Sequence, residues 1–378
     1  MERRLSGIDA PIPMVDLWRL NNSLQEPIDR AIGAVIRQGD FVQGRAVKRF
    51  EENAAVYLGV DHAIGVASGT DALLMALRAA DIGPGDEVIT TPFSFWSTSE
   101  AIHHAGATPI YVDIESESMN LDPAGIENAI TPNTRAILPV HIFGQVASME
   151  IIKSIADQYG LIVIEDAAQA FGAESEGHKA GTFGDFGCFS FYPTKPLGSF
   201  GDGGLVITDD STLANKLRQL GNHGAAVLNC HREFGYNSRL DSIQAAVLDV
   251  KLKYLDSHLA ERRRLANNYT VMLSGLPIRL PRAVADYSHI YGQYTLRCDQ
   301  RDLLRQQLQQ ANIATAIYYA TPLYDQRAYE GAFENLFLPI TEITCRRCLS
   351  LPLYEGLSME HQEAIGYAIR RFFGFFGV

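Results

Sequence analysis

Short apolar segments rich in β-branched residues alternate, over the first part of the chain, with longer segments of helical pattern. In the longer segments apolar residues recur three or four positions apart, as in DALLMALRAA (71–80) and STLANKLRQLG (211–221), which is the spacing of a helix with one buried face. Strands that alternate with helices predict an α/β fold with a seven-stranded, mostly parallel sheet covered on both faces. The segments with the length and composition of strands are residues 63–67, 87–91, 109–113, 135–140, 161–165, 186–191 and 204–208.

The pattern changes beyond a long, charged segment of helical character at 258–273. After it, residues 291–299 and 315–323 have the pattern of strands and are separated by another helical segment. A chain of 378 residues is also longer than a usual single domain. We therefore predict a large domain at 1–256, which includes the N-terminal segment, and a smaller C-terminal α+β domain at 257–378.

Composition and charge exclude several classes of function. The net charge of −12 argues against nucleic acid or an acidic membrane surface as a partner. The N-terminus has no apolar core of a signal peptide, and no apolar run is long enough to span a bilayer. Five cysteines form no even disulfide framework, which suits a reducing compartment, and the histidines show no metal-binding spacing. We predict a cytoplasmic protein with no membrane segment and no metal.

One lysine, Lys195, has unusual surroundings. It lies in the glycine-rich sequence FSFYPTKPLGSFGDGG (189–204), between two apolar strand-like segments. A lysine in a glycine-rich turn is most often a surface residue. Here, however, Pro193, Pro196 and Leu197 make the loop stiff and partly apolar. Desolvation in such a loop lowers the pKa of an amine and favours the neutral form that condenses with an aldehyde.

Two further features precede this lysine in the chain. Ser68-Gly69-Thr70 stands at the start of a predicted helix, and Asp166 follows the apolar segment at 161–165. Each has a plain structural reading, because hydroxyl residues cap helices and a strand-end acid often caps the next helix. The free N–H groups at a helix start can also hold a phosphate, and a buried aspartate can hold a protonated ring nitrogen.

Taken together, these features meet the needs of pyridoxal 5′-phosphate (PLP). This cofactor has a phosphate to hold, a pyridine nitrogen to keep protonated and an aldehyde to join to an amine. In a parallel sheet, ligands bind beyond the carboxyl ends of the strands. The Ser-Gly-Thr turn, Asp166 and the Lys195 loop all follow predicted strands, as do FSFW (93–96) and HIFG (141–144), so we expect them to converge.

The chain resembles the DegT/DnrJ/EryC1/StrS family of PLP-dependent sugar aminotransferases from about residue 13 to residue 357. It looks closest to the members that aminate UDP-linked 3-keto hexuronic acids. The resemblance implies the fold of PLP-dependent transferases of fold type I. It is carried by SGTDAL, GDEVITTPFSFWST, EDAAQAFGA, FSFYPTKPLG, GYNSRLDSIQAAVL and SLPLY.

The resemblance also implies roles around the cofactor. Lys195 corresponds to the catalytic lysine, which binds the cofactor covalently and then moves the proton between cofactor and substrate. Asp166 matches the partner of the pyridine nitrogen, and Gln169 matches a side chain near the 3-hydroxyl group. Phe95 is expected to stack on the ring. The residues that match phosphate ligands are Gly69, Thr70 and Ser190.

Other roles implied by the resemblance concern the partner subunit and the substrate. Asn237 matches an asparagine that reaches the phosphate of the neighbouring subunit's cofactor, which implies a homodimer with shared active sites. Arg239 is expected to contact an anionic part of the substrate, and a structural salt bridge is an equally good interpretation. The segment 317–324 (IYYATPLY) departs from the VHYP-x-PLH pattern of many members on the substrate side. We predict substrate contacts from Tyr318 and Tyr319, but the departure leaves the sugar specificity open.

The predicted reaction moves an amino group from L-glutamate, which leaves as 2-oxoglutarate, to a keto group of a nucleotide-linked sugar. The product would serve the synthesis of a surface polysaccharide or a secondary metabolite. The sugar carbon and the choice between UDP and dTDP stay open. Three alternatives remain: a sugar dehydratase of the same fold, a fold type I enzyme acting on amino acids alone, and a PLP-binding regulatory protein without turnover. The dehydratases replace the lysine by histidine, so Lys195 argues against that alternative.

Overall fold

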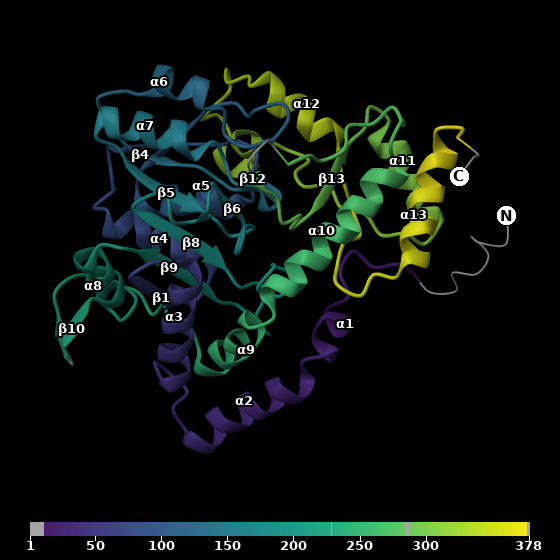
Figure 1. The fold of residues 1–378 in the computed structure, drawn as a ribbon. Coiled ribbons are helices and arrows are strands. Elements are labelled where there is room, and N and C mark those ends of the chain that lie inside the picture. The colour runs from purple at the N-terminus through teal and green to yellow at the C-terminus, as the bar shows by residue number, and fades with distance from the viewer. Residues whose placement is uncertain (1–10, 228, 284–286, 376–378) are drawn as a thin grey trace.

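The computed structural model describes residues 11–227, 229–283 and 287–375. Its centre is a seven-stranded sheet in the order β1-β9-β8-β5-β4-β2-β3 (Figure 1). Strand β9 runs antiparallel to β1 and β8, and the other neighbouring strands are parallel. The predicted strands and the α/β fold class are therefore confirmed. The strands are β1 (His62–Val66), β2 (Glu87–Thr90), β3 (Thr108–Tyr111), β4 (Thr134–Leu138), β5 (Ile162–Asp166), β8 (Phe186–Ser190) and β9 (Gly204–Thr208).

Helices cover both faces of this sheet because alternate strand residues face opposite sides. In β5, Val163 belongs to a core shared with α3, α7 and α9, whereas Ile164 belongs to a core shared with α4, α5 and α8. Helices α3 and α7 end at Gly59 and Gly160, whose φ angles of 76° and 66° suit glycine at a helix end. The helices of this part are α1 (Leu17–Asn22), α2 (Gln25–Gln38), α3 (Arg45–Leu58), α4 (Gly69–Ala79), α5 (Trp96–Ala105), α6 (Ile126–Ala129), α7 (Met149–Tyr159), α8 (Ser211–Leu220) and α9 (Ser242–Leu252).

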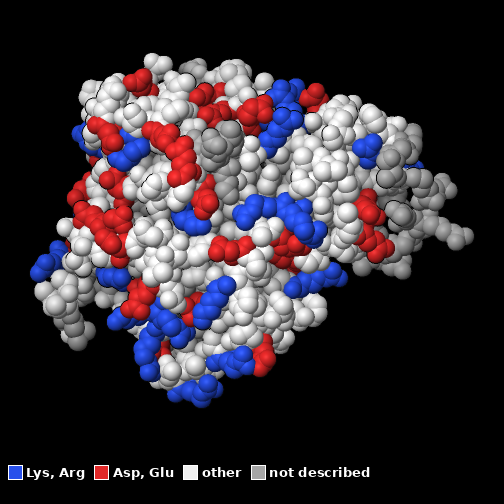
Figure 2. Space-filling model, viewed as in Figure 1, with Lys and Arg blue, Asp and Glu red and all other residues white. Residues whose placement is uncertain are grey.

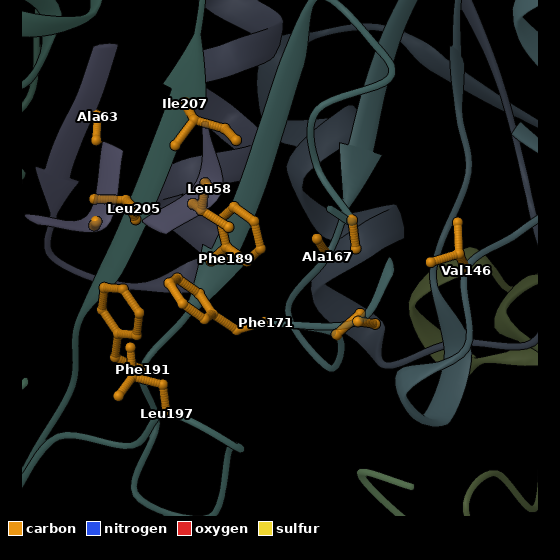
Figure 3. Close-up of a cluster of buried hydrophobic side chains, with 14 of the residues drawn as sticks. Leu58, Ala63, Val146, Ala167, Phe171, Phe189, Phe191, Leu197, Leu205 and Ile207 are labelled. Atoms are coloured by element: carbon orange, nitrogen blue, oxygen red, sulfur yellow. The ribbon is translucent and has the colours of Figure 1, made fainter. Parts of the chain in front are cut away.

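Aromatic side chains fill the core on the α3, α7 and α9 side of the sheet. Phe171, Phe189 and Phe191 lie together in Figure 3, and the Phe171 ring centroid is 4.9 Å from that of Phe189 and 5.9 Å from that of Phe191. Phe189 and Phe191 flank Ser190 at the carboxyl end of β8 and are fully buried. The packing therefore anchors the strand that leads into the Lys195 loop.

A long helix, α10 (Leu255–Met272), carries the chain from the sheet to a second core (Figure 1). Leu255 and Leu259 at its start pack in the core of the sheet, whereas Leu265 and Tyr269 pack in the second core. The predicted boundary at residue 256 lies at the start of this helix and stays a prediction. The second core is built on α10 and on β13 (Tyr294–Arg297), β14 (Cys348–Leu351), α11 (Arg301–Gln310) and α13 (Met359–Phe372). Helix α12 (Pro339–Arg347) instead packs through Cys345 in a separate cluster with Phe93 and Phe143.

The predicted strand at 315–323 is wrong. Only Ala316 forms a β-bridge, with Ser350, and the chain then turns away from β14. The backbone N–H of Leu323 instead donates to the carbonyl of Pro92 in the sheet part (2.8 Å). A contact of this kind between distant segments overrides the local strand preference of the tyrosines.

The remaining elements are short. They are β6 (Glu174–Ser175), β7 (His178–Lys179), β10 (Ala225–Val227), β11 (Cys230–His231), β12 (Tyr287–Ser288) and the 3-10 helices Pro123–Gly125, Ile142–Gly144, Leu323–Asp325 and Arg327–Tyr329. Acidic and basic side chains are interspersed over the face shown in Figure 2. Within the described part of the chain, no helix has the length and apolar character needed to cross a membrane.

Candidate active site

The start of α4 is pressed against two strands of the sheet. A Cβ atom on Gly69 would lie 2.6 Å from the Cβ of Ser190, at the end of β8. A Cβ atom on Gly204, at the start of β9, would lie 2.3 Å from the carbonyl oxygen of Ser68. Both positions therefore require glycine. The N-cap is Ser68, whose hydroxyl accepts from the backbone N–H of Asp71 (3.1 Å), so the capping residue is the serine and not the neighbouring threonine.

This arrangement makes the helix start a suitable place for a phosphate. The first N–H groups of a helix have no partner within the helix and carry partial positive charge. The hydroxyl of Thr70 lies 2.8 Å from that of Ser97, and Ser190 accepts from the backbone N–H of Tyr192 (3.3 Å). Gly69, Thr70 and Ser190 are thus brought together as predicted for a phosphate site, although their binding role stays a prediction.

Asp166 ends β5 and is 5% exposed. Its Oδ2 accepts from the hydroxyl of Thr98 (2.7 Å), and its Oδ1 accepts from the backbone N–H of Ala168 (3.2 Å). Burial raises the pKa of this carboxyl above its ordinary value, although both hydrogen bonds and the charge of Lys195 act in the opposite direction. The carboxylate therefore lacks enough local compensation for its charge, and a cationic group beside it would supply the deficit.

Lys195 lies in the loop between β8 and β9, close enough to Asp166 for their charges to interact. Burial lowers the pKa of its amine, and Asp166 opposes that shift. A lowered pKa increases the fraction of neutral, nucleophilic amine at neutral pH. The structure thus brings the predicted lysine and aspartate close together, and the role of the lysine stays a prediction.

Gln169 is held between two segments. Its Oε1 accepts from the backbone N–H of Phe143 (2.9 Å), and its Nε2 donates to the hydroxyl of Tyr319 (3.2 Å). Burial raises the pKa of the Tyr319 hydroxyl, which therefore stays protonated at neutral pH. These contacts bring Tyr319 of the predicted substrate segment to the cofactor residues. The preceding residue, Tyr318, is half-buried.

Phe95 occupies the N-cap position of α5, and its side chain is 57% exposed. Its neighbour Phe93 is fully buried and packs edge-on against Phe143 and Tyr319 (6.0 and 5.8 Å between centroids). Phe93 is therefore a core residue, whereas Phe95 leaves a ring free to stack on a bound molecule. That stacking role stays a prediction.

Two predicted residues follow α8 in the chain. Asn237 is exposed and pairs with Asn222 in a β-bridge. Arg239 donates to the side-chain oxygen of Asn222 (3.1 Å) and lines a cavity of about 340 Å³ together with Glu51 and Arg218. In the described part of the chain no carboxylate lies within salt-bridge distance of Arg239, because Glu51 pairs with Arg218 instead. The roles of Asn237 and Arg239 stay predictions.

Two residues that support the site, Thr98 and Lys251, were not predicted from the sequence. Thr98 holds Asp166 and also meets the hydroxyl of Ser94 (2.9 Å). Lys251 in α9 is 3% exposed and donates to the carbonyl of Gly198, three residues after Lys195. The sequence shows Thr98 in the first turn of α5, but it does not show that the hydroxyl of Thr98 binds Asp166, 68 residues further along the chain. A lysine in the apolar helical sequence AAVLDVKL (245–252) was a clearer signal of a buried charge.

The chemistry of the described side chains fits PLP. The glycines at 69 and 204 let the start of α4 pack directly against β8 and β9, where hydroxyls and helix N–H groups suited to a phosphate lie together. Asp166 is a buried anion with two hydrogen bonds, and the nearby Lys195 amine has a lowered pKa. These groups correspond to the phosphate, the ring nitrogen and the aldehyde, respectively.

Comparisons with known proteins identify the family of the chain. The model of the DegT/DnrJ/EryC1/StrS aminotransferase family matches residues 22–370. The chain is 44% identical to the UDP-N-acetyl-3-dehydro-alpha-D-glucosamine 3-aminotransferase of Acidithiobacillus ferrooxidans, over 96% of this chain and 98% of that protein. It is 40% identical to the UDP-2-acetamido-2-deoxy-3-oxo-D-glucuronate aminotransferase of Pseudomonas aeruginosa, over 92% and 96% of the two chains. The crystal structure of S. venezuelae DesV in complex with a ketimine intermediate superposes with a TM-score of 0.93, at 41% identity over 96% and 98% of the chains.

Proposed function

Because this chain belongs to the DegT/DnrJ/EryC1/StrS aminotransferase family, we propose that it transfers the amino group of L-glutamate to a ketone at carbon 3 of a UDP-linked sugar. The family confirms the predicted enzyme class and cofactor, a PLP-dependent aminotransferase. The position of the ketone and the UDP carrier rest on the names of two relatives that act on such sugars. The observation that carries the proposal is the buried Asp166 beside the low-pKa amine of Lys195, at the strand ends of this fold.

PLP, when bound, supplies an aldehyde that condenses with amines and a ring that withdraws electrons from the substrate carbon. Lys195 would hold the aldehyde through Nζ, and the same amine would serve as the acid and base that moves the proton at the substrate carbon. Asp166 would accept a hydrogen bond from the protonated ring nitrogen and so keep the ring cationic. Gly69, Thr70 and Ser190 hold the phosphate, Phe95 stacks on the ring, and Gln169 stays near the 3-hydroxyl group.

The substrate lies, in this proposal, on the side of the segment at 317–324. The Tyr319 hydroxyl already meets Gln169, so this tyrosine borders both cofactor and substrate. Tyr318 is half-buried beside it and is proposed to contact the sugar. Arg239 is proposed to contact an anionic part of the substrate. The free thiols of all five cysteines support our proposal that the protein works in the reducing cytoplasm.

The first test is the visible absorption spectrum of the PLP-loaded protein. We expect a band of lysine-bound cofactor that is lost on addition of L-glutamate while the pyridoxamine band grows. UDP-linked 3-keto sugar should then restore the first band, and dTDP-linked 3-keto sugar or a 4-keto isomer should restore it more slowly. A band that L-glutamate does not change would contradict the proposed donor.

Lys195→Ala tests the role of the lysine. The variant should bind PLP without the band of lysine-bound cofactor and should not turn over. Lys153→Ala removes an exposed lysine that pairs with Asp157 on α7, and it should keep the wild-type spectrum. Substantial turnover by Lys195→Ala would refute the assignment.

We also propose a homodimer in which Asn237 completes the partner's phosphate site. The exposure of Asn237 leaves its side chain accessible to a second subunit. Asn237→Ala and Lys195→Ala should each be inactive or weak alone. After subunit exchange, mixed dimers should regain activity, because one of their two sites has both residues intact. No recovery in verified mixed dimers would mean that the sites are not shared.

A further inference from the structure

A second cavity, of about 530 Å³, lies between β13, α12 and the loop after β3. Its walls include Ile278, Ile340 and Ile343, so much of its surface is apolar. Its charged lining residues are three arginines and one aspartate: Arg279, Arg297, Arg347 and Asp299. The cavity is separate from the residues of the candidate active site, and nothing in the proposed aminotransferase reaction uses it.

Arg297 is the central charge of this cavity. It is 9% exposed, and its guanidinium donates to the carbonyl oxygen of Ser116. In the described part of the chain no carboxylate forms an ion pair with it. A buried guanidinium has five N–H donors, and a single carbonyl satisfies only part of them. Arg297 therefore has donors left for a bound group.

Arg279 places a second positive charge beside the first. It is the direct antiparallel partner of Arg297, with both backbone N–H groups donating to the opposite carbonyl at 2.9 Å. Directly opposed residues of an antiparallel pair project their side chains to the same face, and like charges there destabilise the pair. The Glu117 carboxylate, 3.5 Å from the Arg279 guanidinium, offers little relief because both side chains are more than 60% exposed.

The wider electrostatics point the same way. Burial lowers the pKa of Arg297, and the charges of Arg279 and Arg347 lower it further, while Glu117 opposes them. Arg347 is paired with the exposed Asp299 at 2.6 Å. Three arginines thus share two exposed carboxylates, Glu117 and Asp299, and these form their ion pairs with Arg279 and Arg347.

We propose that this cavity binds a small organic anion, with a phosphate or carboxylate group on Arg297 and Arg279 and an apolar portion against the isoleucines. The anion removes the like-charge repulsion and fills the remaining donors of Arg297. The volume exceeds what inorganic phosphate alone would fill, and the apolar wall adds affinity for a ring or short chain. This site is independent of the proposed substrate.

The test uses the PLP-loaded protein, so that the phosphate cradle of the active site is filled. Phenyl phosphate, benzoate and inorganic phosphate are titrated into it by calorimetry. We expect phenyl phosphate to bind, and Arg297→Met to weaken it about tenfold or more, the effect of losing a charge-assisted contact. Arg279→Met should weaken it several-fold. The matched control, Arg305→Met, removes an exposed charge on α11 and should leave the affinity unchanged.

Two results would overturn the proposal. One is no binding of any of the three probes to the wild-type protein. The other is equal affinity in wild type, Arg297→Met and Arg279→Met, since the probe would then bind elsewhere.

Thermal unfolding provides a second measurement that does not depend on the buried variant. Because Arg279 is exposed, Arg279→Met should fold normally. Without a probe it should raise the melting temperature above that of Arg305→Met, because it relieves the repulsion at Arg297. Phenyl phosphate should raise the melting temperature of the wild type more than that of Arg279→Met. A lower melting temperature for Arg279→Met, with the same probe response as wild type, would contradict the proposal.

Discussion

Glu165 and Asp166 are consecutive residues at the end of β5, and their two carboxylates are buried in different environments. Glu165 is fully buried and accepts from the backbone N–H groups of Gly181, Phe183 and Gly184 at 2.7 to 2.8 Å. It also meets Nε2 of His141 at 2.7 Å. The other ring nitrogen, Nδ1, accepts from the backbone N–H of Ala147, so Nε2 carries a proton and donates to Glu165.

Asp166 faces the opposite side of the sheet and accepts only from Thr98 and Ala168. Four donors saturate the carboxylate of Glu165. Only two donors bind the carboxylate of Asp166, which therefore has unused acceptor capacity near Lys195. Burial raises the pKa of Asp166 because these contacts do not offset the loss of water. The comparison teaches that a saturated buried carboxylate holds the fold together, while an incompletely satisfied one is available to a ligand.

Among the variants that test this comparison, Asp166→Asn should have the largest effect on activity. The amide cannot supply a negative charge to the ring nitrogen, so we expect transamination to fall roughly 10²–10³-fold, the range for loss of one preorganised electrostatic contact. Steady-state rates with L-glutamate measure the loss, and circular dichroism checks the fold. Activity within a few-fold of wild type would refute the proposed role of Asp166 as the partner of the ring nitrogen.

Glu165→Gln should act on stability instead. Its amide nitrogen must face at least one N–H donor, which leaves a buried group unsatisfied and removes the charge from the others. We expect a loss of about 3 kcal/mol in the free energy of unfolding. Denaturant unfolding measures it, with Glu26→Gln in the exposed pair with Arg30 as a control that should change by less than about 0.5 kcal/mol. A loss as small as that of the control would show that the Glu165 contacts are dispensable.

Thr98→Val keeps the shape of the side chain and removes the hydrogen bond to Asp166. Without that donor the pKa of Asp166 rises further, and we expect the affinity for PLP to fall about tenfold, as for a lost hydrogen bond to a charged group. Equilibrium dialysis of PLP measures the change. Ser94→Ala removes the neighbouring hydroxyl, which does not touch Asp166, and should have a smaller effect. Equal effects of the two variants would deny Thr98 a specific positioning role.

The pH dependence of the cofactor-free protein gives the smallest expected effect. The pKa of folded Asp166 lies above its ordinary value of 3.8, so the folded state binds the proton more tightly than the unfolded state. Its contribution to stability is therefore present below pH 3.8 and is lost as the pH rises through the raised pKa. Without cofactor, Asp166→Asn should be more stable than wild type at neutral pH, and the difference should shrink on acidification.

Loading with PLP should reverse this order, because a cationic ring stabilises the aspartate and not the amide. Melting temperatures of both proteins across the pH range, with and without PLP, test the sign. If the wild type is more stable than Asp166→Asn at neutral pH both with and without PLP, the raised pKa of Asp166 is contradicted.

Much of the site could be predicted because its parts are local in the sequence. Strand composition located all seven strands of the sheet, and Asp166 and Lys195 follow two of them. The segment at 315–323 shows where local preference fails. Its tyrosines favour a strand, but the contact of Leu323 with Pro92 and the meeting of Tyr319 with Gln169 draw the chain away from β14.

The sequence by itself determined the α/β architecture, the order of the chemistry-bearing residues and the family, because periodicity and motifs depend on neighbours along the chain. Only the tertiary structure decided which partners those residues meet. Thr98 on α5 meets Asp166 at the end of β5, Ser190 lies against Gly69, and Arg297 stands opposite Arg279. The pKa of a buried group depends on such distant neighbours and on the exclusion of water, and both arise only when the chain is packed.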